Sequence, residues 1–206
     1  MELTAAEPAQ DRRVRRSRAA LMQAAVALVT ERGTTAIPLS DIAEAADMSR
    51  RVVYQHFGDR DTLLLEAGLD LVRQKLLPRI ETDTQATARE LTLAVSRHFA
   101  DYRVFYRALL TGSGGFAIDR GLSGLFRPVN RQGIEQVAGD RLDPRLADDL
   151  AAVLTGGAGA FITTWVVDGP DPLDPEAFTD RLLHVMSVLM TAIGRAAGKS
   201  DAEALR

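Results

Sequence analysis

Apolar residues recur at helical spacing from about residue 12 to about residue 197, and no segment alternates in the manner of a half-buried strand. The first apolar face lies within 13–31 and consists of Leu21, Ala24, Ala25, Leu28 and Val29. These positions follow the i, i+3, i+4, i+7 and i+8 spacing of one helix face, and Gly33 lies just past the segment. The chain is therefore predicted to be all-α and to begin with a long helix.

Two short helices are expected next. The first covers about 39–46 and the second about 50–56, with Phe57 on the inner side of the second. Asp47-Met48 forms the connection, and Ser49 is a residue type that commonly caps a helix N-terminus. Two short helices joined by a tight turn have the spacing of a helix-turn-helix motif.

A connecting helix and several helices of a larger bundle follow. A helix over about 59–77 carries apolar stripes on two sides, and Pro78 is expected to end or kink it. Glycines at 112–115 and 121–124 are expected to separate three or four helices within 84–139. Because the connecting helix is apolar on two sides, it is expected to join an N-terminal head to a C-terminal body.

Two long helices, about 144–167 and 175–195, are expected to complete the body, joined by a proline-rich loop. An antiparallel pair of this kind with exposed apolar faces favours packing against a second pair. The predicted division of the chain is a disordered tail over 1–11, a helix-turn-helix domain over 12–58, a helical body over 59–197 and a tail over 198–206.

A basic cluster near the N-terminus stands out in an otherwise acidic chain. The net charge of the 206 residues is −3, which argues against a protein that coats nucleic acids through a generally basic surface. The local cluster is formed by Arg12, Arg13, Arg15, Arg16 and Arg18. A nucleic-acid contact near this cluster is therefore compatible with the overall charge.

Cysteine usage and the N-terminus favour a cytoplasmic location. The chain has no cysteine, which fits a reducing compartment, and 1–11 is acidic without the apolar core of a signal peptide. The segment 150–167 is uncharged and just long enough to span a membrane. Its flanks are acidic rather than basic, which favours a buried bundle helix over a membrane span.

Residues 13–66 carry a motif series in a fixed order: Ala24-Ala25 through Glu31-Arg32-Gly33, then Asp41-Ile42-Ala43-Glu44-Ala45-Ala46, Met48-Ser49, and Tyr54-Gln55-His56-Phe57-Gly58-Asp59-Arg60-Asp61-Thr62-Leu63. This series resembles the N-terminal domain of the TetR/AcrR family of transcriptional regulators. Beyond residue 66 the likeness is architectural only. The resemblance implies a homodimeric repressor that binds a palindromic operator and is released when a small molecule occupies its body.

The chain departs from the family pattern at three positions. Asp47 stands where the family usually has glycine, Pro38 where it has a hydroxyl residue, and Arg60 where it has lysine. Aspartate tolerates left-handed backbone better than most residues, so Asp47 is expected to make the turn. Pro38 cannot cap a helix through its side chain, whereas Arg60 keeps the positive charge.

In a helix-turn-helix the second short helix enters the major groove, so its first residues face the bases. The predicted DNA-binding residues are Ser49, Arg50, Arg51, Val52, Tyr54, His56, Arg60, Arg13 and Arg16. Arg50 or Arg51 is expected to bind a guanine edge, with phosphate or solvent contact as the alternative. Tyr54 and His56 follow the family's phosphate-contacting positions, although the His56 ring could instead pack against the first helix. The N-terminal arginines either contact DNA or form a solvated tail.

The dimer interface is assigned to the last two helices. A single helix-turn-helix reads only a few base pairs, so useful affinity needs two heads fixed at successive turns of the duplex. The predicted interface residues are Leu150, Leu154, Gly157, Phe161, Trp165, Leu182, Val185 and Leu189. The alternative is that the small residues of the first helix pack within one chain.

An effector pocket is expected among the body helices, where most of the aromatic residues gather. The predicted lining is Val72, Leu76, His98, Phe99, Tyr102, Phe105, Tyr106, Phe126 and Phe161, with His98 as a polar anchor. The alternative for each of these residues is an ordinary position in the hydrophobic core. Such a lining would suit an apolar or aromatic ligand.

Catalytic and metal-binding signals are poor, so the chain is predicted not to be an enzyme and to need no cofactor. The histidines at 56, 98 and 184 have no metal-ligand spacing, and no GxSxG or HExxH occurs. The competing interpretation is a protein-interaction module that kept this fold without specific DNA binding. Asp47 in the turn and the negative net charge of the chain favour this alternative. Repression and activation of transcription are not separable from the sequence.

Overall fold

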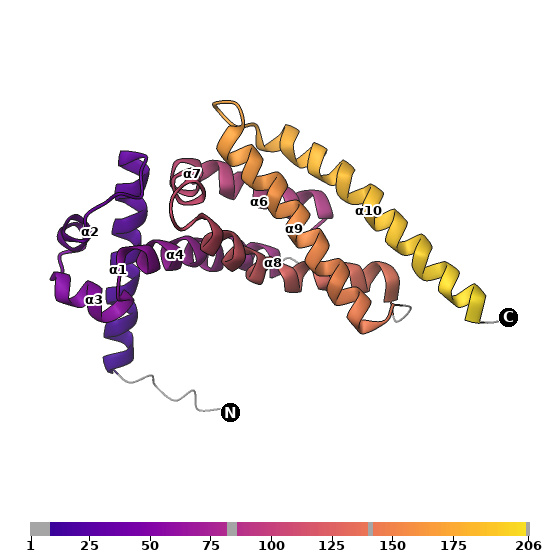
Figure 1. Ribbon diagram of the computed structural model, residues 1–206, viewed down its shortest axis with the longest axis horizontal. Coiled ribbons are helices and arrows are strands. Elements are labelled where there is room, and N and C mark those ends of the chain that lie inside the picture. The colour runs from indigo at the N-terminus through magenta and orange to yellow at the C-terminus, as the bar shows by residue number, and fades with distance from the viewer. Residues whose placement is uncertain (1–8, 82–85, 140–141, 205–206) are drawn as a thin grey trace.

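The computed structural model describes residues 9–81, 86–139 and 142–204, and these form helices without a strand. Figure 1 shows a small N-terminal head joined to a larger body by one helix that leaves the head and runs along the body. The predicted all-α class and the order of a head, a connecting helix and a larger bundle are confirmed. Residues 1–8 of the expected N-terminal tail and 205–206 of the C-terminal tail lie outside the described residues.

The head consists of α1 (Ala9–Arg32), α2 (Leu39–Ala45) and α3 (Arg50–Phe57). Helix α1 begins at Ala9, earlier than the apolar pattern indicates. Its expected inner face is buried at Leu21, Ala24, Ala25 and Val29, and Leu28 is half-buried against the same core. Ile42, Val53 and Phe57 of α2 and α3 complete this core. The head is therefore organised by the 3.6-residue apolar period of its longest helix.

The connecting segment continues through Pro78 instead of ending there. Helix α4 (Arg60–Leu71) passes into a π-helical turn, η1 (Val72–Leu76), and then into α5 (Leu77–Glu81). A proline inside a helix lacks an N–H and crowds the carbonyl four residues earlier. The wider π turn directly before Pro78 changes the hydrogen-bond pattern at that point, so the proline alters the helix without terminating it.

Three body helices follow: α6 (Ala88–Asp101), α7 (Arg103–Thr111) and α8 (Gly115–Ala138). The break expected at 112–115 is present, whereas the break expected at 121–124 is wrong, because these residues lie inside α8. Gly121 has a packing reason, since a Cβ there would lie 2.8 Å from a methyl carbon of Leu69 on α4. Its lack of a side chain lets α8 approach the connecting helix.

The last two helices are α9 (Pro144–Asp168) and α10 (Pro175–Ala204), which run in opposite directions (Figure 1). Helix α10 extends well past residue 195, where its apolar pattern fades. Helix α9 packs mainly along α8, and α10 packs along α6 and α8 more than along α9. By length and composition α9 could also cross a membrane, but that test is passed equally by core helices, and its contacts with α8 favour a bundle helix.

Candidate nucleic-acid interface and body cavity

The turn between α2 and α3 is closed by backbone hydrogen bonds around Asp47. The Met48 amide donates to the Ala43 carbonyl at 2.8 Å, and the Asp47 amide donates to the Glu44 carbonyl at 3.0 Å. This pair of bonds is a Schellman motif, which needs a left-handed residue after the helix. Asp47 adopts that conformation with a φ of 53°, so the expectation that aspartate can make this turn is confirmed.

Pro38 and Ser49 occupy the N-cap positions of α2 and α3 in extended conformation, and neither side chain forms a cap hydrogen bond within the described residues. For Pro38 this is the expected result, because it has no side-chain acceptor. For Ser49 the expected position is right, but its hydroxyl does not accept from the first turn of α3. The Ser49 side chain is exposed and is therefore available to another acceptor or donor.

Arg18 fixes the C-terminal end of α3 against α1 and α4. Its Nη1 donates to the His56 carbonyl at 2.6 Å, and its guanidinium lies 4.3 Å from the centroid of the Phe57 ring. Its Nη2 lies 3.4 Å from the Glu66 carboxylate on α4. One of the five predicted basic-cluster arginines therefore positions α3, while Arg13 and Arg16 are exposed on α1.

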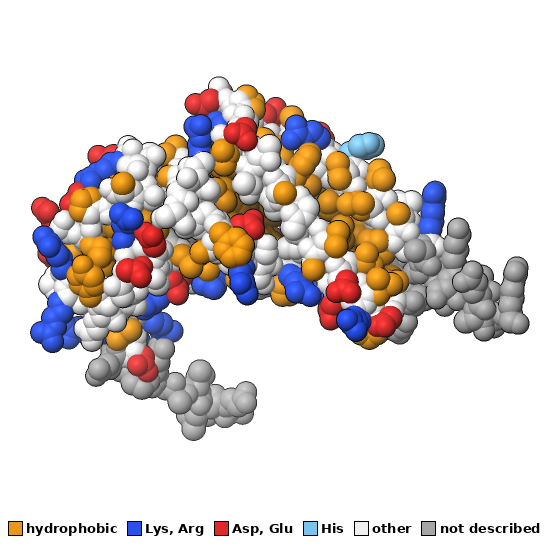
Figure 2. Space-filling model, in the orientation of Figure 1, with side chains coloured by type: hydrophobic (Ala, Val, Ile, Leu, Met, Phe, Trp, Pro, Cys, Tyr) orange, Lys and Arg blue, Asp and Glu red, His pale blue; other side chains and the backbone are white. Residues whose placement is uncertain are grey.

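The outer side of α3 is polar and open to solvent. Ser49, Arg50 and Arg51 are exposed, and Tyr54 is 57% exposed, while Val53 on the opposite side is fully buried. Figure 2 shows blue arginine side chains gathered at this end of the molecule, with acidic groups between them. The structure therefore brings four of the predicted DNA-binding residues onto one accessible surface, which we call the α3 outer face: Ser49, Arg50, Arg51 and Tyr54.

Three other predicted DNA contacts, Val52, His56 and Arg60, are less free. Val52 is half-buried against the head core. The His56 ring is half-buried, and burial, followed by the charge of Arg18, lowers the pKa of His56 below 6.5. Arg60 is engaged by Asp61, with Nε donating at 3.0 Å, so a phosphate would have to compete with that carboxylate.

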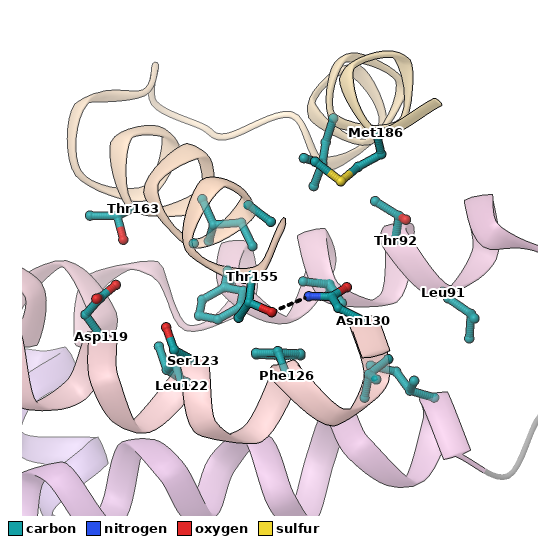
Figure 3. A pocket seen from close by; sticks show the side chains of 18 of the residues that line it. Leu91, Thr92, Asp119, Leu122, Ser123, Phe126, Asn130, Thr155, Thr163 and Met186 are labelled. Atoms are coloured by element: carbon teal, nitrogen blue, oxygen red, sulfur yellow. Dashed lines mark hydrogen bonds between the residues drawn. The ribbon is translucent and has the colours of Figure 1, made fainter. Parts of the chain in front are cut away.

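The body holds an apolar cavity of about 190 Å³ between α6, α8, α9 and α10 (Figure 3). Of the nine residues expected to line a pocket, Phe99 and Phe126 lie on this cavity. Its walls also include Leu122, Ile162 and Met186. The helical spacing of apolar residues cannot show whether such a residue lines a cavity or packs in the core. The lining also includes polar side chains from α8 and α9: Ser123, Asn130, Thr155 and Thr163.

The other expected lining residues lie away from this cavity. Val72, Leu76, Phe105 and Tyr106 are buried in the core, because the aromatic rings of α6 and α7 pack on one another. His98 belongs to this ring cluster: its Nε2 lies 2.9 Å from the Tyr106 hydroxyl, and burial lowers its pKa to about 4. Tyr102 stacks at an angle on His98 with centroids 5.2 Å apart.

Phe161, expected in both the pocket and the interface, contacts α10 of its own chain. Its ring lies 5.6 Å from Phe178 and 4.6 Å from the Arg181 guanidinium carbon. Trp165 stacks on Phe178 with centroids 4.1 Å apart and is 6% exposed. These aromatic side chains therefore hold α9 to α10 within one chain.

The predicted interface residues divide between core and surface. Leu154 and Leu182 are buried like Trp165, and Leu150 is half-buried, whereas Gly157, Val185 and Leu189 are exposed. Exposed apolar residues that were not anticipated lie on the same two helices. We call the whole exposed set the α9–α10 outer face: Leu146, Val153, Gly157, Val185, Val188 and Leu189.

A short helix buried on one side, preceded by a Schellman turn and carrying arginines on its open side, defines a helix-turn-helix domain of the DNA-binding kind. The family model for bacterial regulatory proteins of the tetR family matches residues 21–67. The N-terminal domain of the chain is therefore similar to the DNA-binding domain of TetR-family regulators. The resemblance seen in the motif series is thereby confirmed.

Curated relatives agree with that assignment. The HTH-type transcriptional regulator Mb3439c of Mycobacterium bovis is 38% identical over 94 residues, which are 46% of this chain and 47% of the relative. The HTH-type transcriptional repressor Rv3405c of Mycobacterium tuberculosis matches with the same identity and coverage. The chain thus spans about half the length of the curated relatives it matches.

Proposed function

We propose that this protein is a dimeric, cytoplasmic repressor that binds a palindromic operator through α3 and is released when a small molecule occupies the body cavity. The observation that carries the proposal is the α3 outer face, where Ser49, Arg50, Arg51 and Tyr54 project from a helix buried on its other side. One of the similar proteins is named a repressor, which supports repression and not activation of transcription.

The α3 outer face offers both kinds of contact that operator binding needs. Arg50 and Arg51 lie in the first turn of α3, the part of a recognition helix that reaches base edges. A guanidinium bound to both acceptors of a guanine contributes about 1–3 kcal/mol of discrimination between bases. The exposed phenol of Tyr54, one turn later, suits a phosphate oxygen, and phosphate contacts fix orientation without reading sequence.

Two observations support dimerisation: the small size of the α3 outer face and the apolar character of the α9–α10 outer face. Val153 is 69% exposed and Val188 is 58% exposed, and these side chains share the outer side of two long helices with Leu146 and Leu189. Figure 2 shows hydrophobic side chains gathered over this part of the body. A second copy packed on the same face would bury them in a symmetric arrangement.

For a ligand in the cavity to release DNA, a change at the cavity must reach the head. Phe99 lines the cavity, and its neighbour His98 contacts Tyr106, whose hydroxyl donates to the Gly68 carbonyl of α4 at 3.1 Å. Helix α4 in turn packs on α1 of the head. We infer that a ligand preferring one position of α6 changes the position of α4 and the spacing of the two heads.

Selection from a random duplex library with the full chain tests the proposal. The expected product is a two-fold symmetric sequence whose half-sites lie about 10 base pairs or a multiple apart. Placed behind a promoter, this sequence should lower reporter output when the chain is co-expressed. Recovery of unrelated sequences would contradict operator binding, and a rise in output would contradict repression.

A further inference from the structure

The body cavity combines an apolar wall with one carboxylate. Its sides are formed mainly by aliphatic and aromatic groups, including Leu91, Val95, Phe99, Phe126 and Ile162. Among the described residues that line it, Asp119 alone is charged, and lysine, arginine and histidine are missing from that lining. The electrostatic character of the cavity is therefore set by a single negative group.

Asp119 lies at one end of the cavity, between α8 and α9. It shares a face of α8 with Ser123 and Phe126, one and two turns further along (Figure 3). Across the cavity, a Cβ built on Gly159 of α9 would lie 3.9 Å from Asp119 Oδ1. Figure 3 shows Thr163 of α9 facing Asp119 at the same end. The carboxylate therefore lies close to α9, at one end of the cavity.

Asp119 is not neutralised from within the chain. The described residues give it no ion pair or hydrogen bond, whereas Asp148, on α9 at the other end of α8, accepts from Arg131 Nε at 2.9 Å. The opposite end of the cavity is polar, and there Asn130 Nδ2 donates to the Thr155 hydroxyl at 2.8 Å. The carboxylate therefore remains available to a group that enters from outside.

The size of the cavity limits the ligand. A dry cavity of about 150 Å³ lined by leucine, isoleucine and phenylalanine holds a benzene-sized molecule, and this cavity has about 190 Å³. One ring with a short alkyl arm fills such a space. Phe99 and Phe126 supply aromatic surfaces for it, and the arm would carry its terminal group to Asp119.

We propose that this cavity binds a small organic cation, namely a one-ring or short-chain apolar body carrying a protonated amine, with the amine at Asp119. Asp119 is exposed to solvent, so a positive group gains a modest, water-screened attraction there, and burial of the apolar body in the cavity supplies the rest of the affinity. A carboxylate ligand is repelled there, so the same residue rejects anions of the same shape. The inference rests on the proposed function for its regulatory meaning, but binding itself requires no DNA.

Three probes with one body and different ends test the charge preference directly. 4-Phenylbutylamine, 4-phenylbutan-1-ol and 4-phenylbutanoate are titrated into the full chain by calorimetry at pH 7. The amine is expected to bind about two- to fivefold more tightly than the alcohol, which is the gain of an exposed ion pair, and the carboxylate most weakly. Equal affinity of amine and alcohol, or no binding of the amine, would overturn the proposal.

Three variants locate the effect. Asp119→Asn should lower amine affinity to the level of the alcohol and leave the alcohol unchanged, while Asp101→Asn, an exposed acid at the end of α6, should change neither. Phe126→Ala should weaken the amine and the alcohol together. An amine that binds Asp119→Asn as tightly as the unchanged protein would overturn the assignment to this carboxylate.

The fate of the protein–DNA complex separates this inference from the proposed function. If the amine binds in an Asp119-dependent way but does not release the selected duplex, the ligand class stands and the effector role fails. If the duplex is bound and is released by a cell extract while the amine does not bind, operator regulation stands and the ligand class fails.

Discussion

The Tyr106 hydroxyl donates a hydrogen bond to the backbone carbonyl of Gly68 across 3.1 Å in the buried interior, which joins α7 to the connecting helix α4. The same oxygen lies 2.9 Å from His98 Nε2 on α6. Because the single hydroxyl proton is directed to Gly68, His98 must donate from Nε2, which defines its neutral tautomer. Three helices are therefore held by one phenol beside the cavity.

Tyr106→Phe should lower the free energy of unfolding by about 1–3 kcal/mol, because it leaves the buried His98 donor without its partner. Urea unfolding followed by far-UV circular dichroism measures the change. Tyr102→Phe is the matched control, because Tyr102 is half-buried and contacts His98 through its ring; it should stay within about 0.5 kcal/mol. Equal losses of unfolding free energy in both variants would contradict a stabilising role for the hydrogen bonds of the Tyr106 hydroxyl.

Stability should fall as the pH drops from 6.5 toward 4. Burial lowers the pKa of His98 to about 4, so in this window the unfolded chain binds a proton that the folded chain does not. The free energy of unfolding then decreases by at most about 1.4 kcal/mol per pH unit for this group and is independent of it above pH 6.5. The lowered pKa of His56 acts in the same direction.

Urea midpoints from pH 7.5 to 4.5 measure this dependence. His98→Gln should flatten it, because glutamine can donate to Tyr106 but does not titrate. His184→Gln, a change on the exposed side of α10, should leave the slope as it is. Parallel curves for the unchanged protein and His98→Gln would contradict the assignment to His98.

Arg18→Ala should destabilise the head by about 1–2 kcal/mol, because the His56 carbonyl loses a charged donor and the Phe57 ring loses its cation. The pair with Glu66 is half-exposed and adds little. Far-UV circular dichroism should show a head transition before that of Trp165 fluorescence, since Trp165 lies in the body. Arg13→Ala, exposed on the same helix, should leave both transitions in place.

Val153→Asp and Val188→Asp should each convert the protein to single chains of 22.3 kDa, because each places a charge on the α9–α10 outer face. Light scattering measures the mass. Phe116→Asp, at the start of α8 with 78% exposure, is the control and should leave the dimer intact. Trp165→Asp is unsuitable, because Trp165 is stacked inside the chain. Dimers in both valine variants would place the interface elsewhere.

The head could be predicted almost entirely from the sequence, because its information is local. The apolar spacing of α1, the short α2 and α3 and the turn at Asp47 all depend on neighbours within a few residues. The capping box of Thr87 and Glu90 before α6 also has a local signature, Thr-x-x-Glu, which the helical apolar pattern does not include. Local signals of this kind act on backbone hydrogen bonds that form within one element.

The cavity and the exposed faces of the body could not be predicted in the same way. Aromatic residues such as Phe105 and Tyr106 have the composition of a pocket, but they pack against each other, and the cavity opens between helices whose spacing depends on the whole bundle. Trp165 faces α10 because Phe178 lies opposite it. Helical periodicity gives the apolar side of a helix and not the element that covers it.

Recognition through α3 is tested by the affinity of the full chain for a selected duplex and for a shuffled duplex of equal composition, measured by fluorescence anisotropy at fixed salt. The unchanged protein should prefer the selected duplex by at least about a thousandfold, and Arg195→Ala, an exposed arginine on α10, should keep that preference. The Arg50→Ala/Arg51→Ala variant should lose at least about tenfold on the selected duplex. An unchanged affinity of this double variant, or equal binding of both duplexes by the unchanged protein, would contradict recognition through α3.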